Sequence, residues 1–550
     1  MRTRFTSIRP ACPAVLPRQT AATVNVQAVR RGSLTVSLCP ALAIAAILML
    51  AALFRLWHLH AFPPATDEIA YARWAVDIWR DHTRAGLIIP IMDDGKQPLL
   101  FWVEAGLYGL GLPPVLAGRM LSAGAGVLTV AVCYALARRF YGHAAGLAAA
   151  ALYAVVPFAV WHDRLSLVDA PLTLAVAVVA YAVARMADEA GWRWSMLAAG
   201  AGLCAVGIKG PGVTTAILPA LAWVLLARQR RRTFLPLLLP AVVIGALYAF
   251  MMYGPLGWRF RYMVAVHSID LRQPLPALVK AWAENADVLR SYLTGYFPAV
   301  WLVVLAGCSA LPMLTRRRAD LYVLGSAAAG VLPVIFYGWE IYSRYFLPGL
   351  PFVAVLWGRL LGVLAVWVCI RWPRWRSSYA WIHVLVVPVL LLPLAWRSLL
   401  IVRAPEHAPI ARHDRWQYIT AFPSGWGLRE ATDAIERDAN GRLVFVLTTA
   451  QRSVTRDFVY LRFLDHPTIR HYVEWEVRQG TRSSLARWLT HGVPIYIVAN
   501  RGREELESIE RNWPDATVVA RIPRPGGESE VVVYRLPQLA SAQPSAETTG

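Results

Sequence analysis

The feature that most constrains this chain is a series of apolar segments that recurs between residues 38 and 401. Each is roughly 17–25 residues long, the length at which an α-helix crosses the ~30 Å hydrocarbon core of a bilayer. The segments lie at 38–57, 117–137, 144–161, 167–186, 194–209, 212–228, 234–253, 297–315, 319–338, 345–368 and 380–401. The sequence therefore predicts a polytopic α-helical membrane protein with about 11 transmembrane helices, and up to about 13.

The composition of the chain excludes the other common classes of protein. Hydrophobic residues make up 57% of the 550 residues and charged residues only 16%, which an ordinary soluble protein does not show. The net charge is +21, but no soluble segment carries the basic face that a nucleic-acid-binding protein needs. The six cysteines do not have the spacing of a metal site.

The distribution of arginine predicts the orientation of the chain in the membrane. The short loops at 138–143, 185–193, 228–233, 316–319 and 371–379 are rich in arginine, and they lie on the same side as the N-terminal tail. Positively charged loops remain in the cytoplasm. We therefore expect a multi-pass protein of the inner (plasma) membrane, with a cytoplasmic N-terminus and an extracytoplasmic (periplasmic) C-terminal domain.

The sequence predicts four parts. These are a disordered cytoplasmic tail (1–37), a transmembrane domain (38–401) with an outer loop at 58–116, an extracytoplasmic α/β domain (402–537), and a disordered tail (538–550). In the outer loop, amphipathic patterns predict interfacial helices at 67–80 and 97–110. In the α/β domain we expect helices at 428–439, 483–491 and 503–513, and strands at 442–448, 494–500, 517–522 and 530–536.

Two adjacent carboxylates begin the outer loop. Asp67 and Glu68 follow the first apolar segment and precede several aromatic residues. Acids at a helix start can simply interact with the helix dipole. Ionisable groups beside a membrane segment are more often functional, and a carboxylate here is suited to act as a general base toward a hydroxyl or an amine.

Lysine is rare in this chain, and the lysines that remain are informative. Only Lys96, Lys209 and Lys280 stand among the 55 basic residues. An ammonium is more compact than a guanidinium and differently hydrated, so a lysine kept in an arginine-rich chain indicates a specific site. Lys96 can form an ion pair with a neighbouring aspartate at a turn, or it can neutralise a phosphate leaving group.

A third acid starts an apolar segment at Asp169. A buried acid needs a partner, and either Arg164 or Lys209 can provide it. Lys209 precedes a Gly-Pro-Gly turn between two apolar segments, which would bring both the ammonium and open backbone into a cavity; the alternative is a lysine that extends to the interface.

Further charged groups mark the last two outer segments. His267 and Arg272 lie five residues apart, and arginine suits bidentate contact with phosphate, whereas a lone interfacial histidine is more often structural. Arg344 and Tyr345 begin another apolar segment, where an arginine either extends to the interface or lines a site.

Taken together, these motifs resemble the bacterial protein O-mannosyltransferase and aminoarabinose transferase superfamily. Its members are membrane glycosyltransferases of the GT-C fold that use polyprenyl-phosphate sugars, and the resemblance covers about residues 60–350. The matching motifs are Asp67-Glu68 with Tyr71, Lys96-Gln97-Pro98, Arg164 with Asp169-Ala170-Pro171, Lys209-Gly210-Pro211, His267 with Arg272, and Arg344-Tyr345-Phe346.

The resemblance implies roles for these residues. Asp67 would be the catalytic base, and Asp169 and Glu68 would be further acids of the site. Lys96, Arg272 and Lys209 would bind the donor phosphate. The substrate cavity would be lined by Tyr71, Arg164, His267, Arg344 and Tyr345.

The chain departs from the family pattern at two positions. Gly95 stands where the family often has a glutamate that ligates a metal, and Ala70 stands where aminoarabinose transferases tend to have an arginine. The sequence therefore predicts no metal site and no resident cofactor, leaves a divalent metal without support, and argues against aminoarabinose as the donor sugar.

The predicted function is transfer of a hexosyl or pentosyl group. The donor would be an undecaprenyl-phosphate-like sugar, the acceptor an extracytoplasmic lipid, polysaccharide or protein, and the attack in line with inversion. The alternative is a transporter or flippase of a lipid-linked saccharide. That class has internal repeats and broken helices at the midplane, and neither is apparent in the sequence.

Overall fold

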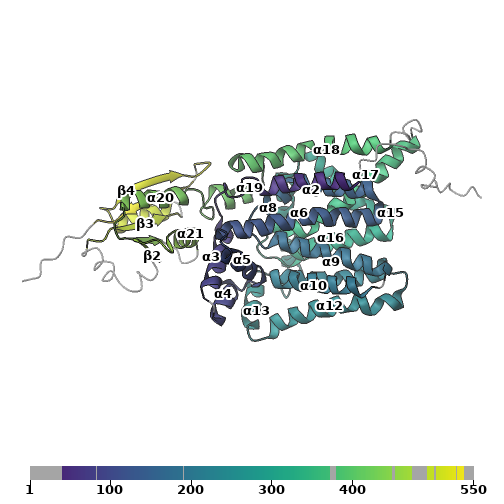
Figure 1. The fold of residues 1–550 in the computed structure, drawn as a ribbon, viewed down its shortest axis with the longest axis horizontal. Coiled ribbons are helices and arrows are strands. Elements are labelled where there is room, and N and C mark those ends of the chain that lie inside the picture. The colour runs from purple at the N-terminus through teal and green to yellow at the C-terminus, as the bar shows by residue number, and fades with distance from the viewer. Residues whose placement is uncertain are drawn as a thin grey trace, which may run out of the picture.

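The structure is a computed structural model that describes residues 40–81, 83–189, 191–371, 379–448, 453–473, 492–500, 503–527 and 529–537. Long helices lie side by side in a bundle, and a smaller part that contains a β-sheet lies at one end of it (Figure 1). The predicted tails at 1–37 and 538–550 and the predicted helix at 483–491 fall outside the described residues.

Every apolar segment that was predicted to cross the membrane is helical. Three of them are broken, at Val156 and where a 3-10 turn precedes an α-helix. In chain order the helices are α2 (Pro40–Leu56), α6 (Pro114–Tyr141), α7 (His143–Val155) with α8 (Pro157–Asp163), α9 (Asp169–Glu189), α10 (Trp192–Ile208), η1 (Gly210–Ala216) with α11 (Ile217–Leu225), α12 (Arg230–Tyr253), α15 (Ala299–Thr315), α16 (Arg318–Tyr337), η2 (Ser343–Gly349) with α17 (Leu350–Arg371), and α18 (Tyr379–Arg403).

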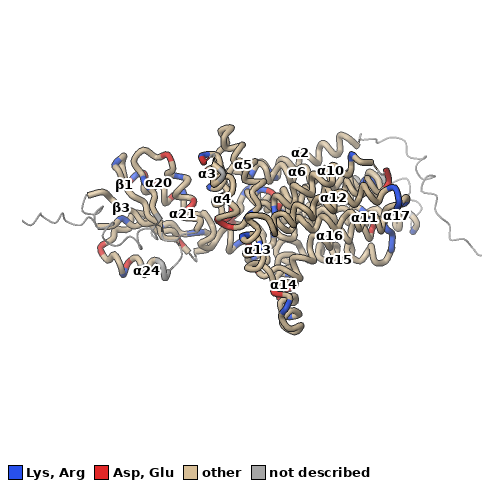
Figure 2. The backbone as a smooth tube through the Cα atoms, turned by 90° about the horizontal axis from the view of Figure 1, so that it is seen from below, with Lys and Arg blue, Asp and Glu red and all other residues tan. Residues whose placement is uncertain are grey.

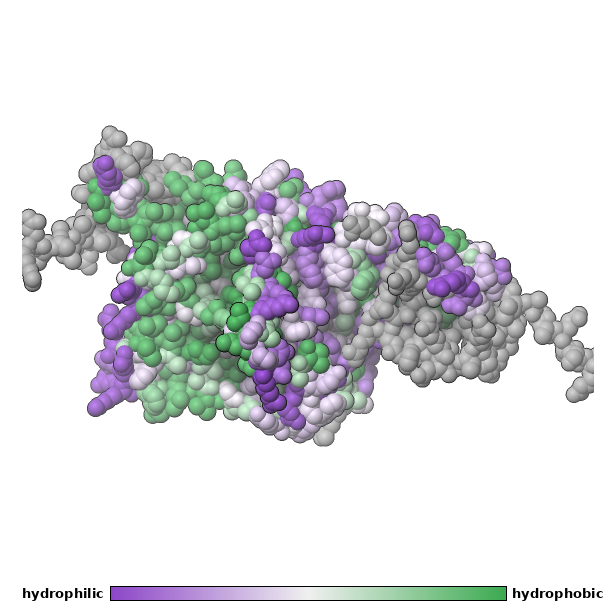
Figure 3. Space-filling view, turned by 180° about the vertical axis from the view of Figure 1, so that it is seen from behind, coloured by the Kyte–Doolittle hydropathy of each residue, from purple (hydrophilic) through white to green (hydrophobic). Residues whose placement is uncertain are grey.

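The outside of the bundle is apolar. Large hydrophobic side chains such as Leu128, Phe250 and Val303 are more than half exposed, which suits contact with lipid. On the face that Figure 3 shows, an apolar belt crosses the bundle, and charged residues gather toward the two ends of the bundle (Figures 2 and 3). Within the described residues, 6 helices are long and apolar enough to span a membrane, or 7 if the bent pair of α7 and α8 is one span. The prediction of eleven spans stays a prediction.

Short helices cover the end of the bundle that faces the sheet (Figure 1). Two of them, α3 (Thr66–Arg80) and α5 (Leu99–Gly109), lie where the sequence predicts helices. Three more were not predicted, namely α4 (Arg84–Asp94), α13 (Gly257–Val266) and α14 (Leu275–Tyr296). These segments mix apolar and charged residues without a long apolar run, so their hydropathy gives a weaker signal than a membrane span does.

The C-terminal part contains a five-stranded mixed sheet with the strand order β2-β1-β3-β5-β4. β1 pairs in parallel with β2 and β3, whereas β5 is antiparallel to β3 and β4. Its elements are α20 (Leu428–Ala439), β1 (Val444–Thr448), α21 (Val454–Phe463), β2 (Ile469–Val473), β3 (Ile495–Ala499), α24 (Arg503–Asn512), β4 (Thr517–Pro523) and β5 (Glu530–Arg535). All but α21 and β2 lie where the sequence predicts them; those two carry interspersed charges that hide their periodicity.

The α/β part is attached to the bundle through α3. Ile69 packs into the same apolar core as α20 and β1. On the next turn Arg73 forms an ion pair with Asp457 of α21, with Nε and Oδ1 3.0 Å apart, and Tyr460 donates a hydrogen bond to Asp77. The same face of α3 thus holds the α/β part by one apolar contact and several polar ones.

We expect Arg73→Ala to loosen this attachment. Breaking a largely buried pair should cost about 3 kcal/mol, the low end for such pairs because Arg73 is 16% exposed. Arg80→Ala is the matched control, since its partner Asp465 is 75% exposed and such pairs contribute less than about 1 kcal/mol. Hydrogen exchange of α20 and α21 should rise in Arg73→Ala only; equal exchange in both variants would contradict this role.

Candidate active site at the end of the bundle

Four charged side chains from distant segments form a continuous chain of ion pairs. Arg344 of η2 donates from Nη2 to Asp67 Oδ2 of α3 at 2.7 Å, and its Nε lies 3.6 Å from Asp169 Oδ2 of α9. Lys209, between α10 and η1, donates to the other oxygen of Asp169 at 2.7 Å. The order Asp67–Arg344–Asp169–Lys209 alternates acid and base, so each charge has an opposite neighbour.

Local structure explains how each of these residues reaches the cluster. Asp169 is the first residue of α9, where the helix dipole favours an acid. Lys209 ends α10 in an extended conformation, and Gly212 folds the chain back so closely that a Cβ there would lie 2.3 Å from the Ala205 backbone. This tight turn brings the ammonium to Asp169. The sequence prediction that Asp169 needs a basic partner is confirmed, and the partners are Lys209 and Arg344.

Aromatic rings surround the two cations. The Lys209 ammonium lies 3.9 Å from the centre of the Tyr345 ring, and the Arg344 guanidinium lies 4.3 Å from that of Tyr342. Arg344 also hydrogen-bonds to the hydroxyl group of Tyr418 at 2.9 Å. Cation–π contacts of this kind stabilise a charge in a partly dehydrated site.

Lys96 lies within electrostatic range of the same cluster. Its ammonium is 3.5 Å from Asp94, so the ion pair considered from the sequence is present. The phenol of Tyr71 and the carboxylates of Asp94 and Asp67 raise the pKa of Lys96 against the effect of burial. Burial also raises the pKa of Tyr71, so near neutral pH the carboxylates are the charged neighbours. Lys96 therefore stays an ammonium.

The turn before Lys96 is held by a residue that the sequence analysis did not single out. Arg259 of α13 donates to the backbone oxygen of Asp93 at 2.7 Å and to that of Ile91 at 3.4 Å. Gly95 has a φ of 58°, and a Cβ there would lie 2.2 Å from the Met263 side chain. Only glycine fits this position without displacing α13, which explains why no acidic side chain stands before Lys96.

The predicted phosphate ligand Arg272 and the predicted cavity residue His267 do not join the cluster. Both side chains are exposed, and among the described residues neither forms an ion pair with the chain of charges. The Arg272 backbone N–H donates to Asp270 in a local turn. The sequence predicts that these two residues lie in an outer segment. It does not give their distance from the charged side chains of the cluster.

Glu68 lies in a different environment from its neighbour Asp67. Its carboxylate is fully buried and accepts two hydrogen bonds from Arg119 of α6, at 2.8 and 3.0 Å. It also accepts from the backbone N–H groups of Ser166 and Ala65. Successive helix residues point in different directions. Both oxygens of Glu68 are therefore engaged in joining α3 to α6, and neither is free for the predicted catalytic role.

Arg164 does not contact Asp169, although the sequence allows it as a partner. Its guanidinium instead donates to the backbone oxygens of Phe54, Trp57 and His58, at 2.8–3.3 Å. These carbonyls end α2 and have no intrahelical partners. Arg164 therefore caps α2, and it faces another cavity rather than the charged cluster.

Ser343, the residue before Arg344, belongs to a buried polar network that was not predicted. Ser343 donates its hydroxyl proton to Asp414 at 2.7 Å, and Tyr296 donates to the other oxygen of Asp414 at 2.6 Å. Ser343 also lies 3.0 Å from Nε2 of His162. Because its hydroxyl proton is already donated to Asp414, His162 is the donor in this second hydrogen bond. Three segments thus fix the residue beside Arg344.

The described residues do not fit a metal ion. Within them no group of three or more His, Cys, Asp and Glu side chains is arranged to hold one. Gly95 offers no ligand, and the carboxylates of the charged cluster already pair with cations.

Known proteins share part of this sequence and its fold. Residues 95–258 match a family model described as dolichyl-phosphate-mannose-protein mannosyltransferase, a range that includes Lys96, Asp169 and Lys209. A comparison with curated proteins finds no match. The prediction of a resemblance to the GT-C mannosyltransferase and ArnT-like superfamily is confirmed.

Two solved structures share the fold. The apo form of ArnT from Cupriavidus metallidurans has 17% sequence identity and a TM-score of 0.50, over 91% of this chain and 98% of that one. The same protein bound to undecaprenyl phosphate has 16% identity and a TM-score of 0.50, over 92% and 100%.

The environments of Asp67 and Glu68 predict losses of stability of different size for the matched amide substitutions. Glu68→Gln should lower the free energy of unfolding by about 3 kcal/mol or more, because Arg119 loses its buried partner. Asp67→Asn should cost less than about 2 kcal/mol, because Arg344 keeps Asp169 and Tyr418. Thermal unfolding of the purified variants measures both; a larger loss in Asp67→Asn would be contrary to these positions.

Asp414 predicts a pH dependence of stability. Burial raises its pKa to about 6, against the hydrogen bonds from Tyr296 and Ser343 and the charge of Arg344. Because the unfolded value is about 3.9, folding favours the protonated acid. This stabilisation is complete below about pH 4 and is lost as the pH rises to about 6, a change of about 3 kcal/mol. The stability difference between the wild type and Asp414→Asn should show it; a pH-independent difference would contradict the burial.

Proposed function

We propose that this protein is a membrane glycosyltransferase that uses a polyprenyl-phosphate sugar as donor. The observation that carries the proposal is the cluster of Asp67, Arg344, Asp169 and Lys209, with Lys96 in electrostatic range, at one end of an apolar bundle. The family model supports the sugar donor class, and the bound undecaprenyl phosphate of ArnT supports a lipid phosphate as its carrier. The acceptor is an extracytoplasmic lipid, polysaccharide or protein.

Asp67 is the proposed base. It is 29% exposed on its side chain, whereas Asp169 is only 2% exposed, so Asp67 is the carboxylate that an acceptor can reach. It removes the proton of an acceptor hydroxyl or amine, and the freed electron pair attacks the anomeric carbon in line. The bond from that carbon to the phosphate oxygen breaks with inversion, and polyprenyl phosphate leaves.

Lys96 stabilises the phosphate as it leaves. A fixed ammonium that is held beside the reacting bond lowers the barrier without reorganisation. Arg259 supports the turn that positions it. For Arg272 to bind the same phosphate, as the resemblance implies, its exposed segment has to turn toward Lys96.

The donor phosphate also gives Arg344 a second role. In the structure the Arg344 guanidinium donates to Oδ2 of Asp67, so this oxygen faces a cation rather than an acceptor. A phosphate competes well for a guanidinium. Binding of the donor phosphate therefore draws Arg344 from Asp67 and leaves this carboxylate open to the acceptor.

The orientation that we propose for the protein in the membrane follows from the distribution of arginine between its loops. The bundle spans the inner membrane with its N-terminus in the cytoplasm, so the charged cluster and the α/β part at 402–537 lie on the periplasmic side. There the α/β part, which is joined to α3, limits how an acceptor approaches Asp67.

Transfer of a radiolabelled sugar from polyprenyl phosphate to envelope extracts tests the proposal. In the purified protein in nanodiscs, Asp67→Asn should lower kcat roughly 10²- to 10⁴-fold, and Lys96→Ala roughly 10²- to 10³-fold. Lys280→Ala is the matched control, since that lysine is exposed and should change nothing.

Two results would overturn the proposal. One is full transfer by Asp67→Asn. The other is movement of the labelled lipid across the membrane without formation of a glycosylated product, which would identify a flippase. Mass spectrometry of envelope glycans with and without Asp67→Asn names the acceptor class.

A further inference from the structure

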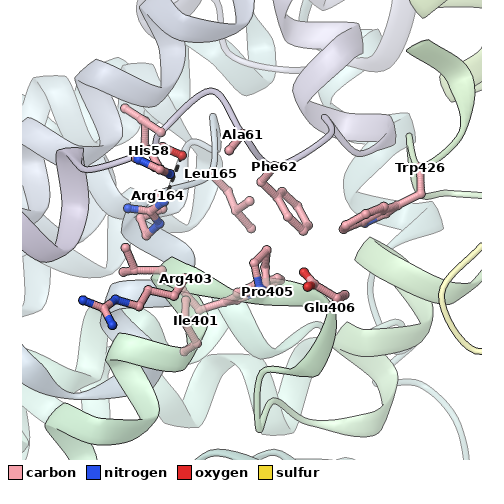
Figure 4. Close-up of a pocket in the computed structure, with 13 residues that line it drawn as sticks. His58, Ala61, Phe62, Arg164, Leu165, Ile401, Arg403, Pro405, Glu406 and Trp426 are labelled. Atoms are coloured by element: carbon pink, nitrogen blue, oxygen red, sulfur yellow. Dashed lines mark hydrogen bonds between the residues drawn. The ribbon is translucent and has the colours of Figure 1, made fainter. Parts of the chain in front are cut away.

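A cavity lies apart from the charged cluster, where α2 and α18 end. It has a volume of about 170 Å³, far more than one water molecule needs but less than a whole lipid occupies. Phe62, Trp426 and Glu406 reach it from opposite sides (Figure 4). Asp67, Asp169, Lys209 and Arg344 are not among its lining residues.

One side of this cavity is aromatic. The ring centre of Phe62 lies 5.3 Å from that of Trp161 and 6.1 Å from that of Trp426, so three rings form a continuous wall. The indole N–H groups of both tryptophans have no hydrogen-bond partner among the described residues, and Trp161 is only 2% exposed. A buried donor without an acceptor is costly, which indicates that an acceptor can come from outside the chain.

The other side of the cavity is polar and carries charges of both signs. Glu406 follows α18 and offers carboxylate oxygens, whereas Arg403 and His58 offer donors. The Arg164 guanidinium, which donates hydrogen bonds to the carbonyls at the end of α2, also lines the cavity. A ligand with hydroxyl groups can donate to Glu406 and accept from the indole N–H groups of Trp161 and Trp426, and its C–H faces can pack on the aromatic wall.

The position of the cavity connects it to the lipid. α2 and α18 present exposed apolar side chains within two turns or so of their ends, among them Leu56 and Trp57 on α2 and Trp396 on α18. The acyl chains of a lipid can lie along these side chains while its head enters the cavity at the edge of the apolar belt. A soluble ligand has no use for these exposed surfaces.

We infer that this cavity binds the saccharide headgroup of a membrane glycolipid. The aromatic wall stacks on the sugar ring, Glu406 accepts from its hydroxyl groups, and the lipid tail remains between the exposed side chains of α2 and α18. This site does not depend on the proposed transfer reaction, since it shares no residue with the charged cluster.

Native mass spectrometry of the purified full-length chain tests the inference, with galactosyl diacylglycerol as the probe. We expect saturable binding of this lipid, weakened roughly tenfold or more in Trp426→Ala and about 3- to 10-fold in Glu406→Gln, the loss of one hydrogen bond. Trp192→Ala is the matched control, since that tryptophan is 53% exposed on α10 and does not line the cavity, and it should leave binding unchanged. Glu406→Gln keeps the test valid if Trp426→Ala unfolds.

Two further probes separate the sources of the binding. Phosphatidylglycerol, which has no sugar ring, and methyl galactoside, which has no lipid, should each bind at least tenfold more weakly than the galactolipid. Equal binding of phosphatidylglycerol would show a site for charge alone, and equal binding of methyl galactoside would show that the lipid is not needed. Either result, or an equal loss in Trp192→Ala, overturns the inference.

Discussion

The arrangement of this protein depends on one constraint: a charge that is removed from water needs an opposite charge beside it. Arg344 is almost fully buried and lies between the carboxylates of Asp67 and Asp169, while Lys209 completes the pairing of Asp169. These four charges sum to zero. In the reaction that we propose, the phosphate of the donor replaces Asp67 as the partner of Arg344, which couples binding of the donor to release of Asp67.

The same constraint holds the bundle together beside the cluster. Arg55 of α2 pairs with Asp163 of α8 at 2.9 Å, with both side chains fully buried, and Arg119 pairs with Glu68. A bundle that is apolar on its outside gains little from exchanging one lipid contact for another, so directional polar contacts determine how its helices are aligned. These pairs lie near the end of the bundle that carries the cluster, and they join the helices around it.

α3 connects the chemistry with the rest of the molecule. Asp67 points to Arg344, Glu68 to Arg119, Ile69 into the core of the α/β part, and Arg73 to Asp457. Because neighbouring helix residues differ by about 100° in direction, one short helix contacts three different surroundings. The helix that carries the proposed base is therefore also the helix that contacts the α/β part.

The sequence by itself determined where the long apolar helices lie along the chain, most of the elements of the α/β part, and the acids and lysines of the cluster. Apolar length, strand alternation and the cost of an ionisable group beside lipid are all local properties of the chain. Only the tertiary structure decided which charges meet. Arg344 rather than Arg164 reaches Asp169, Glu68 is enclosed by Arg119, and Arg259, which no sequence pattern marked, supports the turn at Lys96. A side chain's partner depends on how distant segments pack, and pairing in a buried site selects among residues that look equivalent along the chain.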